Sequence, residues 1–368
     1  MRVLHVISGL DAGGAEHQLR LLLPRLPVDG EVVTLSHPGA VARALRAGGT
    51  RVHEVGMTSN RDVTVVPRLV RLIRGGGFDL VHTHLYRACV YGRVAARLAG
   101  VPAVATEHSL GDGVLEGRRT SAGVRALYLA TERLGRMTIA VSAVVAARLA
   151  AWGVPARRIT VIPNGIDPAE FRFDPHLRRT TRRRLGIRPD TPVIGAVGRL
   201  VPGKRFDLLI PALARAPGAT LLLVGAGPAG TALEKLAARY GVADRFVVTG
   251  EVAEPHQLYC AMDLFASPSP QETFGLAVIE ALASGLPAIY ACCPALDGVS
   301  PGDRWRRIAG PEALSGALAA GLAAVRERAG ARLPVPDVVG HYDIARLAGS
   351  VADLYRRVVS PVPEGRSS

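Results

Sequence analysis

The chain has 368 residues, a length that suits two domains better than one core. Hydrophobic residues make up 48% of it and aromatic residues 5%, which is typical of a folded α/β protein and excludes a disordered chain. The 45 Lys and Arg residues outnumber the 31 Asp and Glu residues, and the net charge of +14 favours an anionic partner, either nucleotide phosphates, an anionic membrane surface or nucleic acid. Nucleic acid is the least favoured, because the basic residues are spread along the chain without an aromatic-rich binding module.

The cysteines indicate a reducing compartment. They show no metal-ligand spacing, so we expect reduced thiols in a cytoplasmic protein, at Cys89, Cys260, Cys292 and Cys293. The apolar run at residues 1–8 is too short for a signal peptide, and no segment reaches the roughly 18 apolar residues of a membrane span. Any contact with a membrane is therefore expected to be peripheral.

The first 26 residues predict a strand, a glycine loop and a helix. Residues 3–7 are continuously apolar, and residues 15–26 have helical apolar spacing. Glycines let a backbone approach a phosphate or a sugar closely, so Gly13 and Gly14 in the loop are candidate contacts for such a ligand. A generic tight turn explains the same residues equally well.

The rest of the N-terminal half alternates strands and helices. Strands are predicted at residues 31–35, 52–55, 80–82 and 103–106, with helical stretches between them. This alternation predicts a parallel sheet covered by helices on both faces. In such sheets, ligands meet the loops that follow the carboxyl ends of the strands.

Two of those loops carry histidines. His82 and His84 follow one strand, and His108 follows the next. We expect His82 and His84 to be structural and to point to opposite sides of their strand, which would exclude a zinc site there. His108 is the candidate functional histidine, because it ends an apolar strand where a substrate would lie.

Five arginines lie within residues 176–185, in a short helical stretch between the two halves. Such a run could contact anionic lipid head groups. A solvated helix is the favoured interpretation, because no large apolar stripe accompanies the arginines.

Two cationic side chains follow the first strand of the C-terminal half. Arg199 offers a planar fork and Lys204 a point charge, and together they could neutralise a diphosphate. Further on, residues 225–230 contain a glycine turn that resembles a dinucleotide fingerprint. No acidic residue follows about 20 residues later, so NAD binding is disfavoured.

Residues 267–287 are the most informative stretch. A proline-rich loop leads to Glu272, and residues 273–283 are predicted to form one helix that ends before Gly285 and Pro287. Glu280 then lies two turns into the helix, roughly 10–12 Å along the axis from Glu272. That span is similar to the distance between the sugar and the ribose of a nucleotide-diphosphate sugar.

Between the two glutamates, the start of this helix predicts an anion site. The N–H groups of Thr273, Phe274 and Gly275 are expected to be free, at the positive end of the helix dipole. A diphosphate could bind there.

The two glutamates with seven residues between them, followed by Gly285, Leu286 and Pro287, resemble the signature of the retaining glycosyltransferases of family 4, or group 1, which have the GT-B fold. Other segments are similar to the same family in the same order, at residues 13–16, 106–108, 163–167 and 197–204. Beyond Pro287 the chain departs from the family pattern, because residues 289–303 lack its glycine pair.

The resemblance implies an α/β fold of GT-B architecture, with two Rossmann-like, doubly wound parallel-sheet domains facing a central cleft. Residues 1–168 would form the acceptor-side domain, with a C-terminal helix at 341–360 packing back on it. Residues 169–340 would bind the nucleotide sugar.

The resemblance also implies roles for single residues. Glu280 would bind the ribose, Glu272 the sugar hydroxyls, and Gly250 and Val252 the nucleobase, while His108 would orient the sugar. The catalytic set would be His108, Arg199, Lys204 and Glu272, and the donor-binding set Gly13, Gly14, Gly250, Val252, Thr273, Phe274, Gly275, Leu276 and Glu280. The donor phosphate could itself take the acceptor's proton, and no metal or other cofactor is expected.

The predicted activity is transfer of a hexose or N-acetylhexosamine, with retention, from a UDP-linked donor to a small-molecule acceptor such as a natural-product aglycone or pseudosaccharide. Transfer to a lipid-linked envelope precursor stays open, as do a GT-B sugar-nucleotide epimerase and a catalytically silent binding protein. The sequence does not determine the oligomeric state.

Overall fold

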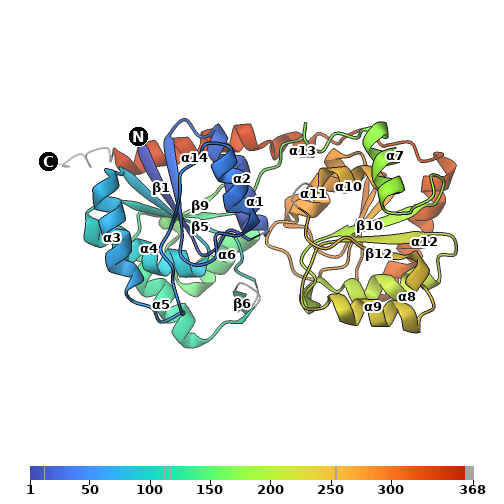
Figure 1. Cartoon of the computed structure of the whole chain (residues 1–368), viewed down its shortest axis with the longest axis horizontal. Coiled ribbons are helices and arrows are strands. Elements are labelled where there is room, and N and C mark those ends of the chain that lie inside the picture. The colour runs from blue at the N-terminus through green and yellow to red at the C-terminus, as the bar shows by residue number, and fades with distance from the viewer. Residues whose placement is uncertain (12, 112, 116–117, 253–254, 361–368) are drawn as a thin grey trace. The chain divides into compact units, whose positions relative to one another are not determined.

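The computed structural model describes residues 1–11, 13–111, 113–115, 118–252 and 255–360. The chain divides into two compact units, Met1–Gly165 with Ile344–Ser368, and Ile166–Asp343. The sequence placed these boundaries at 168 and 340. Each unit is built on one parallel sheet, which confirms the predicted α/β class (Figure 1).

The first unit contains a seven-stranded parallel sheet in the order β3-β2-β1-β4-β5-β8-β9. β6 and β7 pair as a separate antiparallel ribbon. The bounds are β1 Arg2–Ile7, β2 Asp29–Thr34, β3 Val52–Glu54, β4 Leu80–His84, β5 Ala103–Glu107, β6 Val114–Leu115, β7 Arg118–Arg119, β8 Met137–Ala140 and β9 Ile159–Val161.

Helices cover both faces of this sheet (Figure 1). Because side chains alternate along β1, neighbouring residues of this strand pack against helices on opposite faces. Leu4 and Val6 pack against α3 and α4, whereas Val3 on the other face packs against α14. The helices are α1 Gly14–Leu22, α2 Gly39–Ala47, α3 Val65–Gly76, α4 Tyr86–Ala99, α5 Ala122–Glu132, α6 Ala143–Trp152 and α14 Ile344–Val359. Ser142 caps α6 as predicted, since its side chain accepts a hydrogen bond from the Val145 amide.

The second unit contains a six-stranded parallel sheet in the order β12-β11-β10-β13-β14-β15. Strands are added outward in both directions from the central pair β10 and β13, so the order reverses between these two strands. The bounds are β10 Val193–Val197, β11 Thr220–Val224, β12 Phe246–Val248, β13 Leu264–Ser267, β14 Ala288–Tyr290 and β15 Trp305–Arg307.

Helices α8, α9 and α12 cover one face of the second sheet, and α10 and α11 lie over the other (Figure 1). The helices of this unit are α7 Pro175–Arg184, α8 Leu209–Ala214, α9 Gly230–Arg239, α10 His256–Ala261, α11 Leu276–Ala283, α12 Glu312–Glu327 and α13 Val338–His341. α11 starts at Leu276, three residues later than predicted, and β4 extends to His84, two residues beyond its predicted end.

The glycine turn that resembles a dinucleotide fingerprint has a packing role. A Cβ on Gly225 would lie 2.0 Å from the Gly198 carbonyl oxygen, and one on Gly227 would lie 2.4 Å from that of Leu200. The Gly198 amide donates to the Val224 carbonyl at 3.0 Å and the Leu200 amide to the Ala226 carbonyl at 2.9 Å, which ties the two segments together. The turn therefore holds the loop that carries Arg199.

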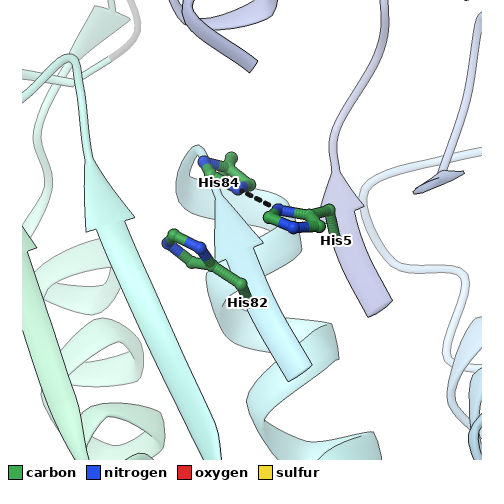
Figure 2. Close-up of side chains that lie close together, drawn as sticks. All are labelled: His5, His82 and His84. Atoms are coloured by element: carbon green, nitrogen blue, oxygen red, sulfur yellow. Dashed lines mark hydrogen bonds between the residues drawn. The ribbon is translucent and has the colours of Figure 1, made fainter. Parts of the chain in front are cut away.

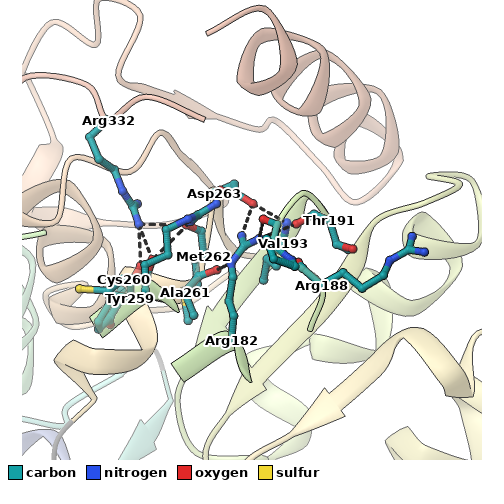
Figure 3. Close-up of polar contacts among 12 residues, drawn as sticks. Arg182, Arg188, Thr191, Val193, Tyr259, Cys260, Ala261, Met262, Asp263 and Arg332 are labelled. Carbon is teal, nitrogen blue, oxygen red and sulfur yellow. Dashed lines mark hydrogen bonds and ion pairs between the residues drawn. The ribbon is translucent and has the colours of Figure 1, made fainter. Parts of the chain in front are cut away.

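The arginine-rich helix α7 is not a fully solvated helix, so that interpretation is wrong for two of its arginines. Arg178 and Arg182 point inward and each lies 2.6 Å from a carboxylate oxygen of Asp263. Arg332 comes from elsewhere in the chain and donates to the carbonyls of Tyr259, Cys260 and Met262 (Figure 3). Burial lowers the pKa of Arg332 to about 10.

Among the residues that the structure describes, no helix combines the length and the apolar character that crossing a bilayer requires.

We expect Asp263→Asn to lower the free energy of unfolding by about 3–5 kcal/mol, because it removes the carboxylate from between Arg178 and Arg182 and leaves their buried charge uncompensated. Urea denaturation measures this. Asp353→Asn is the matched control, since Asp353 pairs with Arg356 at the surface. An equal loss of unfolding free energy in the two variants would contradict a structural role for Asp263 and its two arginine partners.

Candidate functional site

The candidate donor site of the second unit lies where the strand order reverses. The loop after β10 carries Lys204 and the loop after β13 carries Glu272. Their side chains meet, with Lys204 Nζ 2.6 Å from Glu272 Oε1. Residues 68 positions apart in sequence are thus brought together by the two neighbouring strands.

Arg199 lies in the same loop as Lys204, two residues after β10. Its side chain is exposed, while Leu200 next to it is buried and anchors the loop. The structure thus brings Lys204 directly to Glu272 and leaves the Arg199 guanidinium open to solvent, where it can meet an anion.

The segment between Glu272 and α11 differs from the prediction. Thr273 and Phe274 precede the helix, and Gly275 is its N-cap, with a left-handed φ of 101°. The amides that the helix itself leaves without an acceptor therefore begin at Leu276 and Ala277, whereas Thr273, Phe274 and Gly275 precede its first turn. The distance of 10–12 Å predicted between Glu272 and Glu280 assumed a continuous helix and does not apply.

The segment that departs from the family pattern packs behind this turn. A Cβ on Gly275 would lie 2.5 Å from Cys293 Sγ, and the Ala295 amide donates to the Phe274 carbonyl at 3.0 Å. The Tyr342 ring packs edge to face against the Phe274 ring, and the Tyr342 hydroxyl donates a hydrogen bond to the Ala295 carbonyl at 2.6 Å. Residues 293–295 therefore support the start of α11, a role that sequence reasoning missed.

Glu280 lies in the body of α11 and is 6% exposed. Its Oε2 accepts a hydrogen bond from the Tyr259 hydroxyl at 2.6 Å. Burial raises the pKa of Glu280 to about 7, with the Tyr259 hydrogen bond acting in the opposite direction. A carboxylate that is costly to ionise in the free protein gains most from new donors, such as the hydroxyls of a ribose.

Gly250 and Val252, the predicted nucleobase contacts, follow β12. Gly250 has a φ of 74° and forms an isolated bridge with Gly225. Its turn is therefore attached to the same glycine that holds the Arg199 loop.

In the first unit, Gly13 caps α1 and Gly14 is its first residue. A Cβ on Gly13 would lie 2.3 Å from Glu16 Oε2, so the Glu16 carboxylate lies against this helix start. The negative charge stabilises the helix dipole there. A phosphate at Gly13 would have to displace Glu16.

His108 follows β5 and lines a pocket with Gln18, Thr106, Asn164 and helix α14. Gln18 holds the neighbouring segment in place through two hydrogen bonds with the Gly165 backbone, at 2.6 and 2.7 Å. Burial lowers the pKa of His108 to about 4, and a hydrogen bond with the Asn164 side chain raises it in part. The imidazole is therefore neutral near pH 7.

The prediction that His82 and His84 point to opposite sides of their strand is wrong. Residues two apart on a strand share a face, and the two ring centroids lie 4.1 Å apart. His5 on β1 joins them, opposite His82 in the register of the two strands (Figure 2). One donor atom from each ring lies within 4.8 Å of the others, so the spacing argument against a metal no longer holds.

His5 was missed by sequence reasoning. The signal was available, because residues 3–7 are not continuously apolar: His5 lies in the middle of the predicted strand, where a polar side chain needs a partner.

A pH dependence follows from Glu280. Its pKa is raised in the fold, so its contribution to stability is full below its unfolded value of 4.5 and is lost as pH rises through about 7. We expect Glu280→Gln to raise the free energy of unfolding by roughly 2–3 kcal/mol at pH 8 and to have little effect at pH 4. Denaturation at both pH values measures this. Glu234→Gln, at an exposed position of α9, should show no such difference.

The turn before α11 is also testable. We expect Gly275→Ala to lower stability by about 1–3 kcal/mol, because alanine at a φ of 101° is strained and its Cβ would meet Cys293. Adding Cys293→Ala should restore part of the loss by making space. Gly316→Ala, inside α12 with open space around the new Cβ, is the control and should be neutral or stabilising. A neutral Gly275→Ala would contradict the packing described here.

Family models match both halves of the chain. The model described as Glycosyltransferase Family 4 matches residues 12–170, and that described as Glycosyl transferases group 1 matches residues 178–304.

Relatives and solved structures agree with these matches. The chain is 30% identical over 302 residues to a 2-deoxystreptamine glucosyltransferase of Streptomyces kanamyceticus, covering 76% of this chain and 77% of that one. It is 33% identical over 230 residues to a D-inositol 3-phosphate glycosyltransferase of Mycobacteroides abscessus, covering 59% of this chain and 51% of the relative, so it spans about half of that relative's length.

The fold is similar to the crystal structure of Anabaena Alr3699/HepE in complex with UDP-glucose, with a TM-score of 0.84 at 24% identity over 96% of this chain and 99% of that one. The family models, the two relatives and this fold together show that the chain belongs to the group 1 glycosyltransferases of the family 4 type, with the Rossmann-like domains of the GT-B fold.

Proposed function

We propose that the protein transfers a hexose, with retention, from a UDP-linked donor to a hydroxyl of a small cyclitol or pseudosaccharide. The observation on which this rests most is the Lys204–Glu272 ion pair at the start of α11, where the strand order of the second unit reverses. It brings a cation and a carboxylate together four residues ahead of α11, whose first-turn amides have no acceptor within the helix.

The diphosphate of the donor is the ligand that we propose for the site around Lys204 and the start of α11. Lys204 and the first-turn amides of α11 supply positive charge, and the exposed Arg199 guanidinium adds a bidentate donor. This charge would stabilise the diphosphate as its bond to the sugar breaks and negative charge grows on the leaving oxygen. Glu272 would turn from Lys204 to the sugar hydroxyls, and Glu280 would accept the ribose hydroxyls.

Retention is proposed through attack on the face from which the diphosphate leaves. The departing phosphate oxygen takes the proton of the acceptor hydroxyl, so the step needs no separate general base. No residue pair with the acid and base spacing of glycoside hydrolases has to be invoked. The cations and the helix end supply the charge that a divalent metal would otherwise provide, and we propose that none is required.

The acceptor class is supported by the names of the relatives. One is described by 2-deoxystreptamine and the other by D-inositol 3-phosphate, and both of these are hydroxyl-rich six-membered carbocycles. The 2-deoxystreptamine relative also covers more of both chains. The UDP-glucose complex of the Anabaena protein supports UDP as the nucleotide.

Two alternatives are separated by product analysis. An epimerase would convert a labelled UDP-hexose without any acceptor, whereas a transferase would hydrolyse it slowly at most. Transfer to a lipid-linked acceptor would require activity with a polyprenyl-linked sugar and none with deoxystreptamine or inositol.

Nucleotide binding tests the donor site directly. We expect UDP to raise the melting temperature of the protein, and Lys204→Met to weaken UDP binding about 10- to 100-fold, because a charge-assisted hydrogen bond is lost. Calorimetric titration measures this. Lys235→Met, at an exposed position of α9, is the matched control and should bind as the wild type does. Equal UDP affinity in Lys204→Met would remove Lys204 from the donor site.

A further inference from the structure

Tyr259 on α10 is a fixed hydrogen-bond donor to Glu280 on α11. Its side chain is fully buried, and its ring packs edge to face against Phe171 and at a tilt against Phe265, with ring centroids 5.5 and 5.8 Å away. The Phe171 carbonyl in turn accepts a hydrogen bond from the Ser284 hydroxyl at 2.6 Å. The Tyr259 ring is therefore held from two sides, with its hydroxyl 2.6 Å from Glu280 Oε2.

The Tyr259 hydroxyl has one proton and two acceptors within reach. Glu280 Oε2 lies at 2.6 Å and the Ala277 carbonyl oxygen at 3.4 Å. The shorter hydrogen bond, to a carboxyl group, is the stronger one. Burial and the Glu280 carboxylate raise the pKa of Tyr259 well above its usual value, so the hydroxyl keeps its proton. Tyr259 therefore donates, and Glu280 Oε2 accepts.

The two oxygens of Glu280 differ in their surroundings. Oε2 accepts from Tyr259, whereas Oε1 has no hydrogen-bond partner among the described residues. Oε1 is also not among the buried side-chain atoms that lack a partner, so it keeps access to solvent. The carboxyl group is thus anchored through one oxygen and can be reached by a ligand through the other.

A purely structural role does not explain this pair. Burial raises the pKa of Glu280 to about 7, and the negative charge of Glu170, which precedes α7, acts in the same direction. Ionisation of Glu280 near neutral pH therefore lowers the stability of the fold. A buried acid that destabilises the fold and leaves one oxygen unpartnered is typical of a functional site.

We propose that Tyr259 is a positioning residue for the donor nucleotide, which holds Glu280 through Oε2 so that Oε1 is presented to a ribose hydroxyl. The ligand class that this pair selects is a ribonucleotide, because a sugar without those hydroxyls leaves the carboxylate without a new donor. Tyr259 acts through Glu280. The inference rests on the proposed function in one respect, which is that Glu280 accepts the ribose hydroxyls.

Binding of UDP and of its 2′,3′-dideoxy analogue tests the proposal. With calorimetric titration at about pH 8, we expect the wild type to prefer UDP about 10- to 100-fold, and Tyr259→Phe to lower that preference about tenfold. The loss should come from weaker UDP binding, with the affinity for the analogue little changed. If Tyr259→Phe weakened both nucleotides equally, its effect would be structural and the positioning role would be overturned.

Tyr355→Phe is the matched control. It removes the same hydroxyl from another fully buried tyrosine, which in the wild type lies 2.6 Å from His82 Nδ1 in the first unit. It should keep the preference for UDP over the dideoxy analogue. A preference lowered as much in Tyr355→Phe as in Tyr259→Phe would contradict a specific role for Tyr259.

The pH dependence of the wild type is a second measurement, which needs no variant to fold. Because Oε2 accepts from Tyr259, the proton of the neutral acid lies on Oε1, the oxygen that faces the ligand. The preference for UDP should therefore fall as pH drops through about 7. The phosphates of the two nucleotides ionise alike, so their titration cancels in the ratio of affinities. A preference that does not change with pH would overturn the proposal.

Other ionisable groups near Glu280 are controlled for. Among the described residues, those that act on its carboxyl group are Tyr259 and Glu170, and His256 on α10 lies 3.7 Å from Glu170. Glu280→Gln should remove the pH dependence of the preference, whereas His256→Gln should retain it. A pH dependence that persisted in Glu280→Gln would assign the titration to another group and overturn the proposal.

The outcomes distinguish failure of this inference from failure of the proposed function. A ribose preference that Tyr259→Phe retains in full would overturn the positioning role alone. Equal binding of the two nucleotides by the wild type would remove Glu280 from the ribose and overturn both that part of the proposed function and the role of Tyr259. The expected binding without any transfer of hexose to a cyclitol would overturn the proposed function and leave the role of Tyr259 standing.

Discussion

The reversal of strand order in each parallel sheet is the constraint on which the candidate sites depend. Strands on the two sides of the reversal send their helices to opposite faces, so the loops at their carboxyl ends separate and leave room between them. In the second unit these loops hold Lys204 and Glu272 in contact. The equivalent strands of the first unit, β1 and β4, place His5 beside His82 and lead to the glycine loop and to His84.

Both units place ionisable groups where water is scarce, and each does so differently. The second unit neutralises buried charge, with Asp263 accepting from two arginines and Glu280 retaining its proton up to about pH 7. The first unit contains neutral imidazoles whose ring nitrogens form hydrogen bonds with one another. The common cause is the high cost of a buried charge without a partner, which is met either by pairing or by loss of the charge.

Much of the fold could be predicted from the sequence, because apolar runs and glycines mark strands and turns locally. The parallel sheets followed from the alternation of strands and helices and from the family resemblance, whereas the order of the strands and the contact between Lys204 and Glu272 were not predicted. The start of α11 could not be found in this way. The left-handed Gly275 delays the helix, and the reason lies in Cys293, a contact between residues distant in sequence. The inward turn of Arg178 and Arg182 depended in the same way on Asp263, which no local pattern indicates. The pairing of His82 with His84 was available from strand geometry and was predicted wrongly.

The return of α14 to the first sheet affects how the protein can be made. Val3, Leu80, Val104 and Ile139 lie in one apolar cluster with Leu347, Val351 and Leu354 of α14. While the ribosome is still translating the second unit, this cluster lacks its α14 side chains, and His82 lacks the Tyr355 hydroxyl. The nascent first unit must therefore wait, with apolar surface open to chaperones or to aggregation, until the codons for α14 have been read.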